Sequence, residues 1–323
     1  MVRLSDTHEK DTLEMRTVYC GALMQEAEKN DKIVVVNCDL RSSMGLKPFA
    51  KKFPDREINT GIMEANACGM SAGMSAAGLI PFYNTFSVFA SRRVYDQIFQ
   101  SCAYAGLNVK IIGGDAGVTA TSNGGTHMPF EDLGIMRVMP GITVLEPTDA
   151  VMMHSLIPQI ANTYGVHYMR FPRRQVPKIY AEGSEFTIGK GVLLREGTDV
   201  TIMAYGIMVA EALKAADELV AQGIQARVVD MFTIKPIDVQ CVLESACKTG
   251  AIVTAENHQI TGGLGSAVAE ILAEHRPTLL ERVGVNNEFG EVGTQDYLMK
   301  RFGLTAEKII EAVTHVLKRK KHS

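Results

Sequence analysis

The sequence contains no apolar run of the roughly 18 residues that a helix needs to cross a bilayer. Its first residues, MVRLSDTHEKD, are charged from the start and include no apolar core of a secretion signal. The formal net charge of −3 offers no excess of cations for binding nucleic-acid phosphates. We therefore expect a cytoplasmic protein that acts neither in a membrane nor on nucleic acid.

Paired cysteines of the metal or redox type are also missing, because none of the six cysteines forms a C-x-x-C pair. Most of them lie within apolar stretches, so we expect reduced, buried thiols rather than a zinc site or a nucleophile. Low-complexity segments and short solenoid repeats are absent as well. The length of 323 residues corresponds to about two globular domains, each large enough to form its own core.

Short runs rich in valine and isoleucine alternate with helical stretches in both halves of the chain. This alternation is typical of a largely parallel sheet that helices cover on both faces. We expect strands at 33–37, 80–84, 109–114, 142–147, 166–171, 200–205, 226–231, 251–256 and 279–285. We expect helices near 11–29, 207–222, 237–247, 264–274 and 305–318.

A stretch with two prolines and several glycines interrupts this alternation between residues 172 and 197. It is typical of a connector, which predicts a first domain at 1–175, a linker at 176–196 and a second domain at 197–323. The predicted fold class is α/β, with two domains that each contain a mostly parallel sheet with helices on both faces.

A helix rich in small residues is predicted after Glu64, where the sequence reads ANACGMSAGMSAAG. Small side chains permit the close approach of another helix or of a ligand. Glu64 is the only carboxylate of this segment and lies near its start. It is either an acid favoured by the helix N-terminus or a partly buried acid that binds a heteroaromatic nitrogen.

Two phenylalanines, Phe86 and Phe89, are spaced so that they would share one face of a predicted helix. Such a pair is either plain core or a stacking platform for a planar ring. Arg92 would lie one turn further along the same face, where a plain core would not place a charge.

A loop rich in glycine and threonine runs from Gly113 to Asp132, between a predicted strand and a helix expected near Pro129. In parallel sheets the ligand crevice lies outside the carboxyl ends of the strands. His127 in this loop is therefore a candidate for proton transfer or for binding a substrate hydroxyl.

A second glycine-rich string, Gly263-Leu264-Gly265, begins a GxGxxG-like pattern that ends in Val268. It also lies several residues beyond its predicted strand. We interpret it as a weak dinucleotide signal or as a tight turn between a strand and a helix.

The order of these motifs resembles the thiamine-diphosphate enzymes of the transketolase group, over essentially the whole chain. The stretches that carry the resemblance are TFSVFASRRVYDQI, GGTHMPFED and ENHQITGGLGSAVAE. The resemblance implies a pyrimidine-binding domain followed by a transketolase C-terminal domain. We find no GDG motif with a following Asn, which in this family holds Mg²⁺ and diphosphate on an N-terminal domain.

The resemblance therefore implies the C-terminal subunit of a split transketolase that has no metal ligands of its own. A partner subunit would supply the N-terminal domain with its Mg²⁺ and diphosphate site. An α2β2 assembly is the natural expectation, because the active site needs both subunit types.

The resemblance also assigns roles to individual residues. Glu64 corresponds to the catalytic glutamate that hydrogen-bonds the pyrimidine N1′ and so promotes deprotonation of the thiazolium C2. His127 corresponds to a position that contacts substrate near the reacting carbon. The positions that line the cofactor correspond to Asp39, Leu40, Glu64, Phe86 and Phe89. Arg16, Ser43 and Arg173 correspond to substrate positions that bind a terminal phosphate, and the fork of an arginine suits such an oxyanion. Arg92 corresponds to a substrate position near the sugar chain, and His127 also belongs to the substrate positions.

Three positions depart from the family pattern. Gly114 stands where the family often has histidine, and Asn123 where it often has aspartate; those side chains usually contact hydroxyls of the ketose donor. Met63 replaces the familiar arginine before the catalytic glutamate. The cofactor is therefore better defined than the substrate, and a sugar phosphate, a branched sugar phosphate or a sulfonated sugar remains open.

The implied activity is transfer of a two-carbon ketol unit from a ketose to an aldose. The β subunit of a 2-oxo acid dehydrogenase E1 component is an alternative, but we expect it to lack the TH-x-P-x-ED stretch at 126–132. A deoxyxylulose-phosphate-synthase-like enzyme is usually a single longer chain. A non-catalytic scaffold or regulatory paralogue is the third alternative, against which Glu64, Phe89 and His127 argue.

Overall fold

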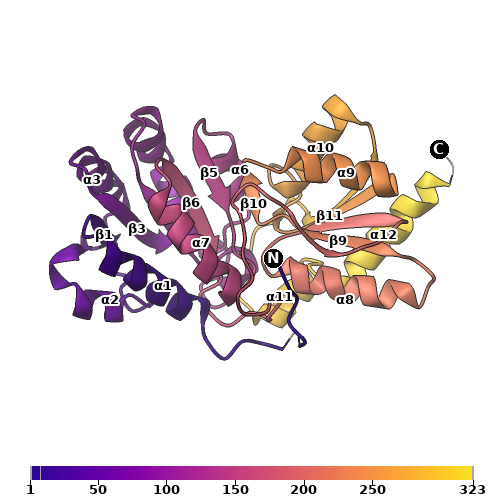
Figure 1. The fold of residues 1–323 in the computed structure, drawn as a ribbon, viewed down its shortest axis with the longest axis horizontal. Helices are drawn as coiled ribbons and strands as arrows, with labels where there is room; N and C mark the ends of the chain where they lie inside the picture. Colours follow the sequence, from indigo (N-terminus) through magenta and orange to yellow (C-terminus); the bar gives the residue numbers. More distant parts are fainter. Residues whose placement is uncertain (1, 8, 322–323) are drawn as a thin grey trace.

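The chain folds into two α/β units that lie side by side (Figure 1). A computed structural model describes residues 2–7 and 9–321. One sheet has seven strands and the other has five, and helices cover both faces of each sheet (Figure 1). The predicted α/β class with two mostly parallel sheets is confirmed.

The first sheet has the strand order β10-β5-β6-β4-β3-β1-β2, and only β10 pairs antiparallel with its neighbour. Every residue of β1 and β4 is buried, which explains why both strands are almost continuously apolar. The strands are β1 (Ile33–Asn37), β2 (Glu57–Asn59), β3 (Ile80–Phe86), β4 (Lys110–Gly114), β5 (Ile142–Leu145), β6 (Val166–Phe171) and β10 (Thr233–Lys235). The α-helices are α1 (Met15–Lys29), α2 (Lys47–Lys52), α3 (Glu64–Ala76), α4 (Ser87–Ala90), α5 (Tyr95–Gln97), α6 (Asp132–Arg137) and α7 (Ala150–Asn162). Short 3-10 turns form η1 (Pro54–Arg56), η2 (Arg92–Val94), η4 (Gly117–Thr119) and η5 (Gly125–His127), and a π-helix forms η3 (Ile98–Tyr104).

The second sheet has the order β12-β11-β8-β9-β7, and only β7 pairs antiparallel. Its strands are β7 (Val192–Arg195), β8 (Val200–Ala204), β9 (Ala226–Asp230), β11 (Ala251–Gln259) and β12 (Leu279–Val285). Its helices are α8 (Met208–Val220), α9 (Val239–Thr249), α10 (Leu264–His275), α11 (Gln295–Arg301) and α12 (Ala306–Lys320). Helices α8 and α12 pack together on one face, and α9 and α10 on the other (Figure 1). Within the described ranges, no helix is both long and apolar enough to cross a lipid bilayer.

Side chains mark the beginnings of several helices. Asp149, Asp238, Thr294 and Thr305 each accept a hydrogen bond from a backbone N–H in the first turn of the helix that follows. Such caps satisfy backbone donors that have no partner inside the helix. The capping residue just before each of α7, α9, α11 and α12 therefore determines where that helix starts.

Three short strands, β2, β7 and β10, differ from the sequence-based expectation. Each has only three or four residues and lies at a sheet edge, so its alternation is too short to recognise. β7 lies inside the predicted linker 176–196. β10 comes from the predicted second domain but pairs with β5 of the first sheet. The chain thus crosses back between the two units after leaving the first.

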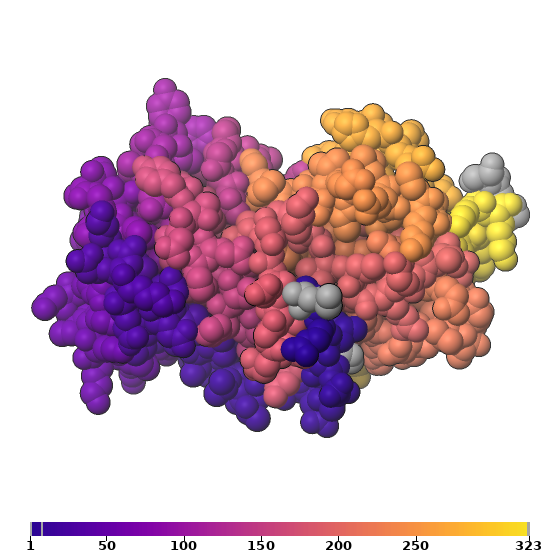
Figure 2. Space-filling model, viewed as in Figure 1, coloured from indigo at the N-terminus to yellow at the C-terminus, as the bar shows by residue number. Residues whose placement is uncertain are grey.

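The N-terminal segment binds the connector between the units. Leu4 bridges Tyr180 and Lys10 bridges Pro177, both antiparallel. In the space-filling view (Figure 2) this segment, in dark indigo, covers the chain near the junction of the two units. The connector is therefore an ordered, covered part of the molecule.

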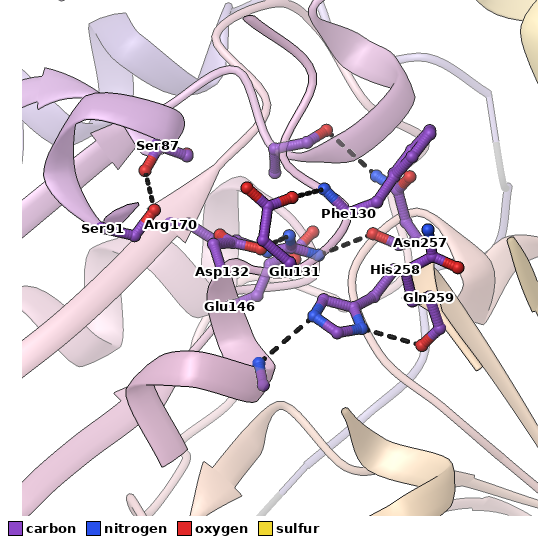
Figure 3. Close-up of polar contacts among 12 residues, drawn as sticks. Ser87, Ser91, Phe130, Glu131, Asp132, Glu146, Arg170, Asn257, His258 and Gln259 are labelled. Carbon is purple, nitrogen blue, oxygen red and sulfur yellow. Dashed lines mark hydrogen bonds and ion pairs between the residues drawn. The ribbon is translucent and has the colours of Figure 1, made fainter. Parts of the chain in front are cut away.

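A buried arginine joins the two units. Arg170 on β6 is 0% exposed and donates to Asp132 and Glu146, both at 2.6 Å. It also donates at 2.8 Å to the backbone carbonyl of Asn257 on β11 of the second sheet. Figure 3 shows this guanidinium reaching from the side of Asp132 and Glu146 toward Asn257. Nearby, the ring of His258 accepts from a backbone N–H of α6 (Figure 3), so side chains of the second unit hold elements of the first.

Candidate functional site

The candidate residues gather at the carboxyl edge of the first sheet. Strands β1, β3, β4 and β6 are neighbours in this sheet and run in the same direction. Their carboxyl ends therefore meet, and ligands of open α/β sheets bind at such an edge. Asp39 and Leu40 follow β1, Phe86 ends β3, and Arg173 follows β6.

Glu64 is the first residue of α3 and is 4% exposed. Its Oε1 accepts a hydrogen bond from Arg93 Nη1 at 2.7 Å. The guanidinium carbon of Arg93 lies 3.5 Å from the centre of the Phe89 ring, as in a cation–π contact. Arg93 thus links the buried carboxylate to the aromatic ring. The sequence motifs pointed to Arg92 instead of this second arginine, whose only signal was its position beside Arg92.

Three rings form an aromatic cluster beside this carboxylate. The centroids of Phe86 and Phe89 are 6.2 Å apart, and the His127 ring lies 5.2 Å from Phe89 and 6.3 Å from Phe86. The expectation that both phenylalanines share a helix face is wrong, because Phe86 ends β3 and α4 spans only four residues. The rings still meet because the chain turns from strand to helix between them.

His127 lies in η5 and is half-buried. Its Nδ1 is 2.8 Å from Thr126 Oγ1, which leaves Nε2 for another partner. The helix expected near Pro129 begins at Asp132 instead, as α6.

Arg92 does not continue the face of the phenylalanines, which corrects the expectation from spacing. It begins η2 and is exposed. Its Nη1 donates to Glu131 and its Nη2 to the carbonyl of Thr126, both at 2.8 Å. Arg92 therefore holds the loop that carries His127, rather than lying on the aromatic rings.

The two arginines expected at a terminal anion converge on one atom. Arg16 Nη1 donates to the carbonyl of Ser43 at 3.1 Å, and Arg173 Nη1 donates to the same carbonyl at 3.3 Å. Each arginine also has a carboxylate partner at 2.6 Å on its Nε, Glu14 for Arg16 and Asp115 for Arg173. These two carboxylates were not predicted, because Glu14 lies outside every motif and Asp115 has no sequence link to Arg173.

The group formed by Arg16, Arg173 and Ser43 is continuous with the aromatic cluster. The guanidinium carbon of Arg173 lies 4.8 Å from the centre of the Phe86 ring. Asp39 is exposed and has a φ of +59°, a left-handed conformation that aspartate tolerates, and its N–H donates to Asn59. Leu40 is half-buried beside it. All the predicted cofactor and substrate positions therefore lie along this one edge of the sheet or in the loops that border it.

The buried side chain of Met44 explains why a glycine stands at position 114. A Cβ at this position would lie 2.6 Å from the sulfur of Met44. Met44 is fully buried and fills the space that a larger side chain at 114 would occupy. Asn123, the second departure, is exposed on the loop.

The glycine string after β11 forms a tight turn into α10. The carboxylate of Glu256 accepts from the N–H groups of Leu264 and Gly265, at 2.8 and 2.9 Å. A Cβ at Gly263 would lie 2.0 Å from the same carboxylate, so only glycine fits there. The start of α10, where a dinucleotide phosphate would bind, is thus filled by the side chain of Glu256.

The expectation of buried thiols holds for Cys20, Cys38, Cys68 and Cys102, whereas Cys241 is half-buried and Cys247 is exposed. All six thiols are free. Within residues 2–7 and 9–321, no three His, Cys, Asp or Glu side chains are grouped to hold a metal ion. The prediction that metal ligands lie on another subunit stays a prediction.

Comparison with known proteins covers almost the whole chain. The transketolase pyrimidine-binding domain profile matches residues 11–178, and the transketolase C-terminal domain profile matches residues 189–309. The chain is 53% identical over 306 residues to the 6-deoxy-6-sulfo-D-fructose transketolase subunit of Clostridium sp. strain MSTE9, with 95% of both chains covered. It is 35% identical over 305 residues to one of the subunits of the apulose-4-phosphate transketolase of Phocaeicola vulgatus, with 94% of this chain and 97% of that protein covered.

A solved structure described as "split gene transketolase, inactive beta4 tetramer" is also similar. It matches with a TM-score of 0.88 at 44% identity, and covers 95% of this chain and 99% of that one. The similarity therefore extends along nearly the full length of separate subunits of this kind.

Proposed function

Because the chain belongs to the transketolase family, as the C-terminal subunit of a split transketolase, we propose that it transfers a two-carbon ketol unit from a ketose to an aldose. In this reaction the donor loses its first two carbons and becomes a shorter aldose, and the acceptor gains them and becomes a longer ketose. The observation that carries the proposal is the buried Glu64 carboxylate, which Arg93 links to the Phe89 ring, itself in contact with the ring of His127.

The residues present fit the pyrimidine end of thiamine diphosphate. Glu64 offers a buried carboxylate to a ring nitrogen, and Phe89 offers a half-buried aromatic face. When bound, the cofactor supplies the electron sink for cleaving the carbon–carbon bond. The Mg²⁺ and diphosphate ligands are expected on the partner subunit.

The other site residues act on the substrate. Nδ1 of His127 contacts Thr126, and among the described residues no hydrogen bond involves Nε2, so this nitrogen can accept a proton from a substrate hydroxyl or donate one to it. Arg16 and Arg173 bind the anionic end of the sugar, because each guanidinium keeps its Nη2 as a charged donor for an oxyanion while Nε and Nη1 hold it in place. Arg92 positions the His127 loop through Thr126 and Glu131.

A partner subunit is supported by the surface next to Glu64. Ile62 and Met63 directly precede it and are 74% and 53% exposed. Large apolar side chains that remain exposed beside a site are typical of surfaces that another protein covers. The relative described as a tetramer of beta subunits is called inactive, which agrees with a site that needs a second kind of subunit. We therefore propose an assembly with an N-terminal transketolase subunit, as α2β2.

The substrate is proposed to be a sugar with an anionic end. The two arginines at Ser43 support this class, and so do the names of two relatives, one for a sulfonated sugar and one for a sugar phosphate. We also propose that the protein acts in the cytoplasm.

The test is reconstitution with a candidate N-terminal subunit that carries a GDG motif followed by Asn. The purified pair is given thiamine diphosphate, Mg²⁺, a sulfonated or phosphorylated ketose and an aldose acceptor, and products are followed by mass spectrometry. We expect a donor shortened by two carbons and an acceptor lengthened by two. Replacing Glu64→Gln should lower kcat at least ~100-fold, because the acid is lost while the shape is kept.

The matched control is Glu307→Gln, which makes the same change in the first turn of α12, away from the site. It should leave kcat unchanged. Full turnover by the Glu64→Gln complex would contradict the role of this carboxylate. An assembled pair that transfers no ketol unit from any ketose would contradict the proposed activity.

A further inference from the structure

We propose that the anion site of Arg16 and Arg173 is matched in charge to a monoanion, so that this subunit selects ketoses ending in a sulfonate over those ending in a dianionic phosphate. The inference rests on the proposed function, whose substrate class it names. Its specificity residues are the two carboxylates that accompany the arginines, Glu14 and Asp115.

The two guanidinium groups are held in the same way. Each uses Nε on a carboxylate at 2.6 Å, and each uses Nη1 on the carbonyl of Ser43. Among the residues that the structure describes, neither Nη2 has a hydrogen-bond acceptor. The Nη2 groups of Arg16 and Arg173 are therefore the donors left for a ligand.

The charges of this cluster cancel. Arg16 and Arg173 contribute two positive charges, and Glu14 and Asp115 contribute two negative charges in direct contact with them. The second pair is well shielded from solvent, since the side chains of Arg173 and Asp115 are 19% and 4% exposed. Within residues 2–7 and 9–321, Asp115 Oδ2 is buried without a hydrogen-bond partner, and the cation that pairs with this carboxylate is Arg173. A ligand therefore meets strong hydrogen-bond donors but no net positive charge.

The side chain of Glu14 does not cap the helix that it precedes. It occupies the N-cap position of α1, where Ser, Thr, Asp or Asn is preferred, and its side chain makes no capping hydrogen bond. Its carboxylate instead contacts Arg16. This second, independent observation assigns Glu14 to the anion site rather than to the helix.

The two kinds of sugar differ in the charge they bring. A sulfonate carries one negative charge at any pH near neutrality. A phosphate monoester loses its second proton with a pKa of about 6, so it carries close to two charges at pH 8. The second charge would lie near two carboxylates and opposite arginines that are already neutralised. Partly buried charges of this kind are screened less by salt than surface charges are.

The experiment compares 6-deoxy-6-sulfo-D-fructose with D-fructose 6-phosphate as donors for the reconstituted holoenzyme, with one acceptor. We expect kcat/KM to favour the sulfonate about tenfold at pH 8, corresponding to about 1.4 kcal/mol. The ratio should approach one at pH 5.5, where the phosphate is mostly a monoanion. The protein itself is the same for both donors, so the ratio of the two kcat/KM values isolates the charge of the sugar.

The variant Glu14→Gln removes one negative charge from the site. It should lower KM for both sugars at pH 8, and by a larger factor for the phosphate, because a dianion gains about twice as much as a monoanion from the loss of one nearby negative charge. Glu28→Gln is the matched control, since Glu28 lies on the same helix and pairs with Lys52 at the surface. It should change neither value.

A preference for the phosphate at pH 8, or a Glu14→Gln ratio equal to that of Glu28→Gln, would overturn the inference. Binding of both sugars to the Glu64→Gln complex, measured by calorimetry, separates the inference from the proposed function. If neither sugar is turned over but the sulfonate binds more tightly, the proposed function fails and the charge selection stands. If both are turned over and the phosphate binds more tightly, the function stands and the charge selection fails.

Discussion

Replacing Arg170→Met is expected to destabilise the protein by about 3–5 kcal/mol at pH 8, the range observed when one partner of a buried ion pair is removed. Arg170 is completely buried and is shared by Asp132 and Glu146, each at 2.6 Å. Methionine fills much of the space but leaves both carboxylates without a cation. It also leaves the carbonyl of Asn257 without its donor at the junction of the two units.

The expected loss depends on pH in a definite direction. Burial raises the pKa of Glu146 to about 7 even beside Arg170. Without the arginine, the folded protein favours the protonated carboxyl still more, whereas the unfolded chain ionises at an ordinary acidic pKa. Protons bound only by the folded state stabilise it at low pH and stop doing so as the pH rises. The variant should therefore lose less stability at pH 6 than at pH 8.

The assay is equilibrium unfolding in urea at both pH values, followed by far-UV circular dichroism. Arg195→Met is the control, because the pair of Arg195 with Asp217 is largely solvent-exposed and should contribute less than about 1 kcal/mol. If the methionine variant does not fold, Arg170→Lys keeps the charge, loses the fork, and should show an intermediate loss. A loss below about 1 kcal/mol that is equal at both pH values would refute the reasoning.

Three further substitutions test other parts of the fold. Burial raises the pKa of Asp230 to about 7, so the stability that its protonated form contributes is complete at acidic pH and is lost as the pH rises through 7. Asp230→Asn should therefore flatten the pH dependence of the free energy of unfolding between pH 5 and 8. An unchanged slope would contradict this. Gly117 has a φ of +51° and an added Cβ would lie 2.1 Å from Asn257 Oδ1, so Gly117→Ala should lower stability by about 2–4 kcal/mol, and calorimetry showing the parental Tm would disprove this. Gly21 lies inside α1 with nothing within 4 Å of an added Cβ, so Gly21→Ala should raise stability by about 0.5–1 kcal/mol in urea unfolding, a result that a decrease would exclude.

Asn257 lies at the junction of the two units and also contacts the loop that carries Asp115. Its side chain accepts from the N–H of Val118 and donates to the carbonyl of Ala116, both at 3.0 Å. These residues follow Asp115, the partner of Arg173. The junction between the two units therefore positions Asp115 and Arg173 of the proposed anion site, and we expect damage to the junction to raise KM for anionic donors.

Local patterns in the sequence were enough for the fold class and for the family. Buried parallel strands need apolar residues at most positions, so β1 and β4 were recognisable from their runs of valine and isoleucine. Glu64, Phe89 and His127 could be proposed as site residues because short motifs surround them. The edge strands β2, β7 and β10 were not, because three or four residues carry no readable period.

What the sequence by itself determined is therefore local: the two α/β units, the residues of the motifs, and the family to which the chain belongs. Only the tertiary structure decided which charges meet. Arg173 and Asp115 are 58 positions apart, and Arg170 and Asn257 are 87 apart, so no local period or motif relates them. The pairing of Glu64 with Arg93 and the pairing of Arg173 with Asp115 in the proposed anion site belong to this second group. Contacts of this kind depend on the order of the strands in each sheet and on the pairing of β10 with the first sheet. Tertiary packing decides both.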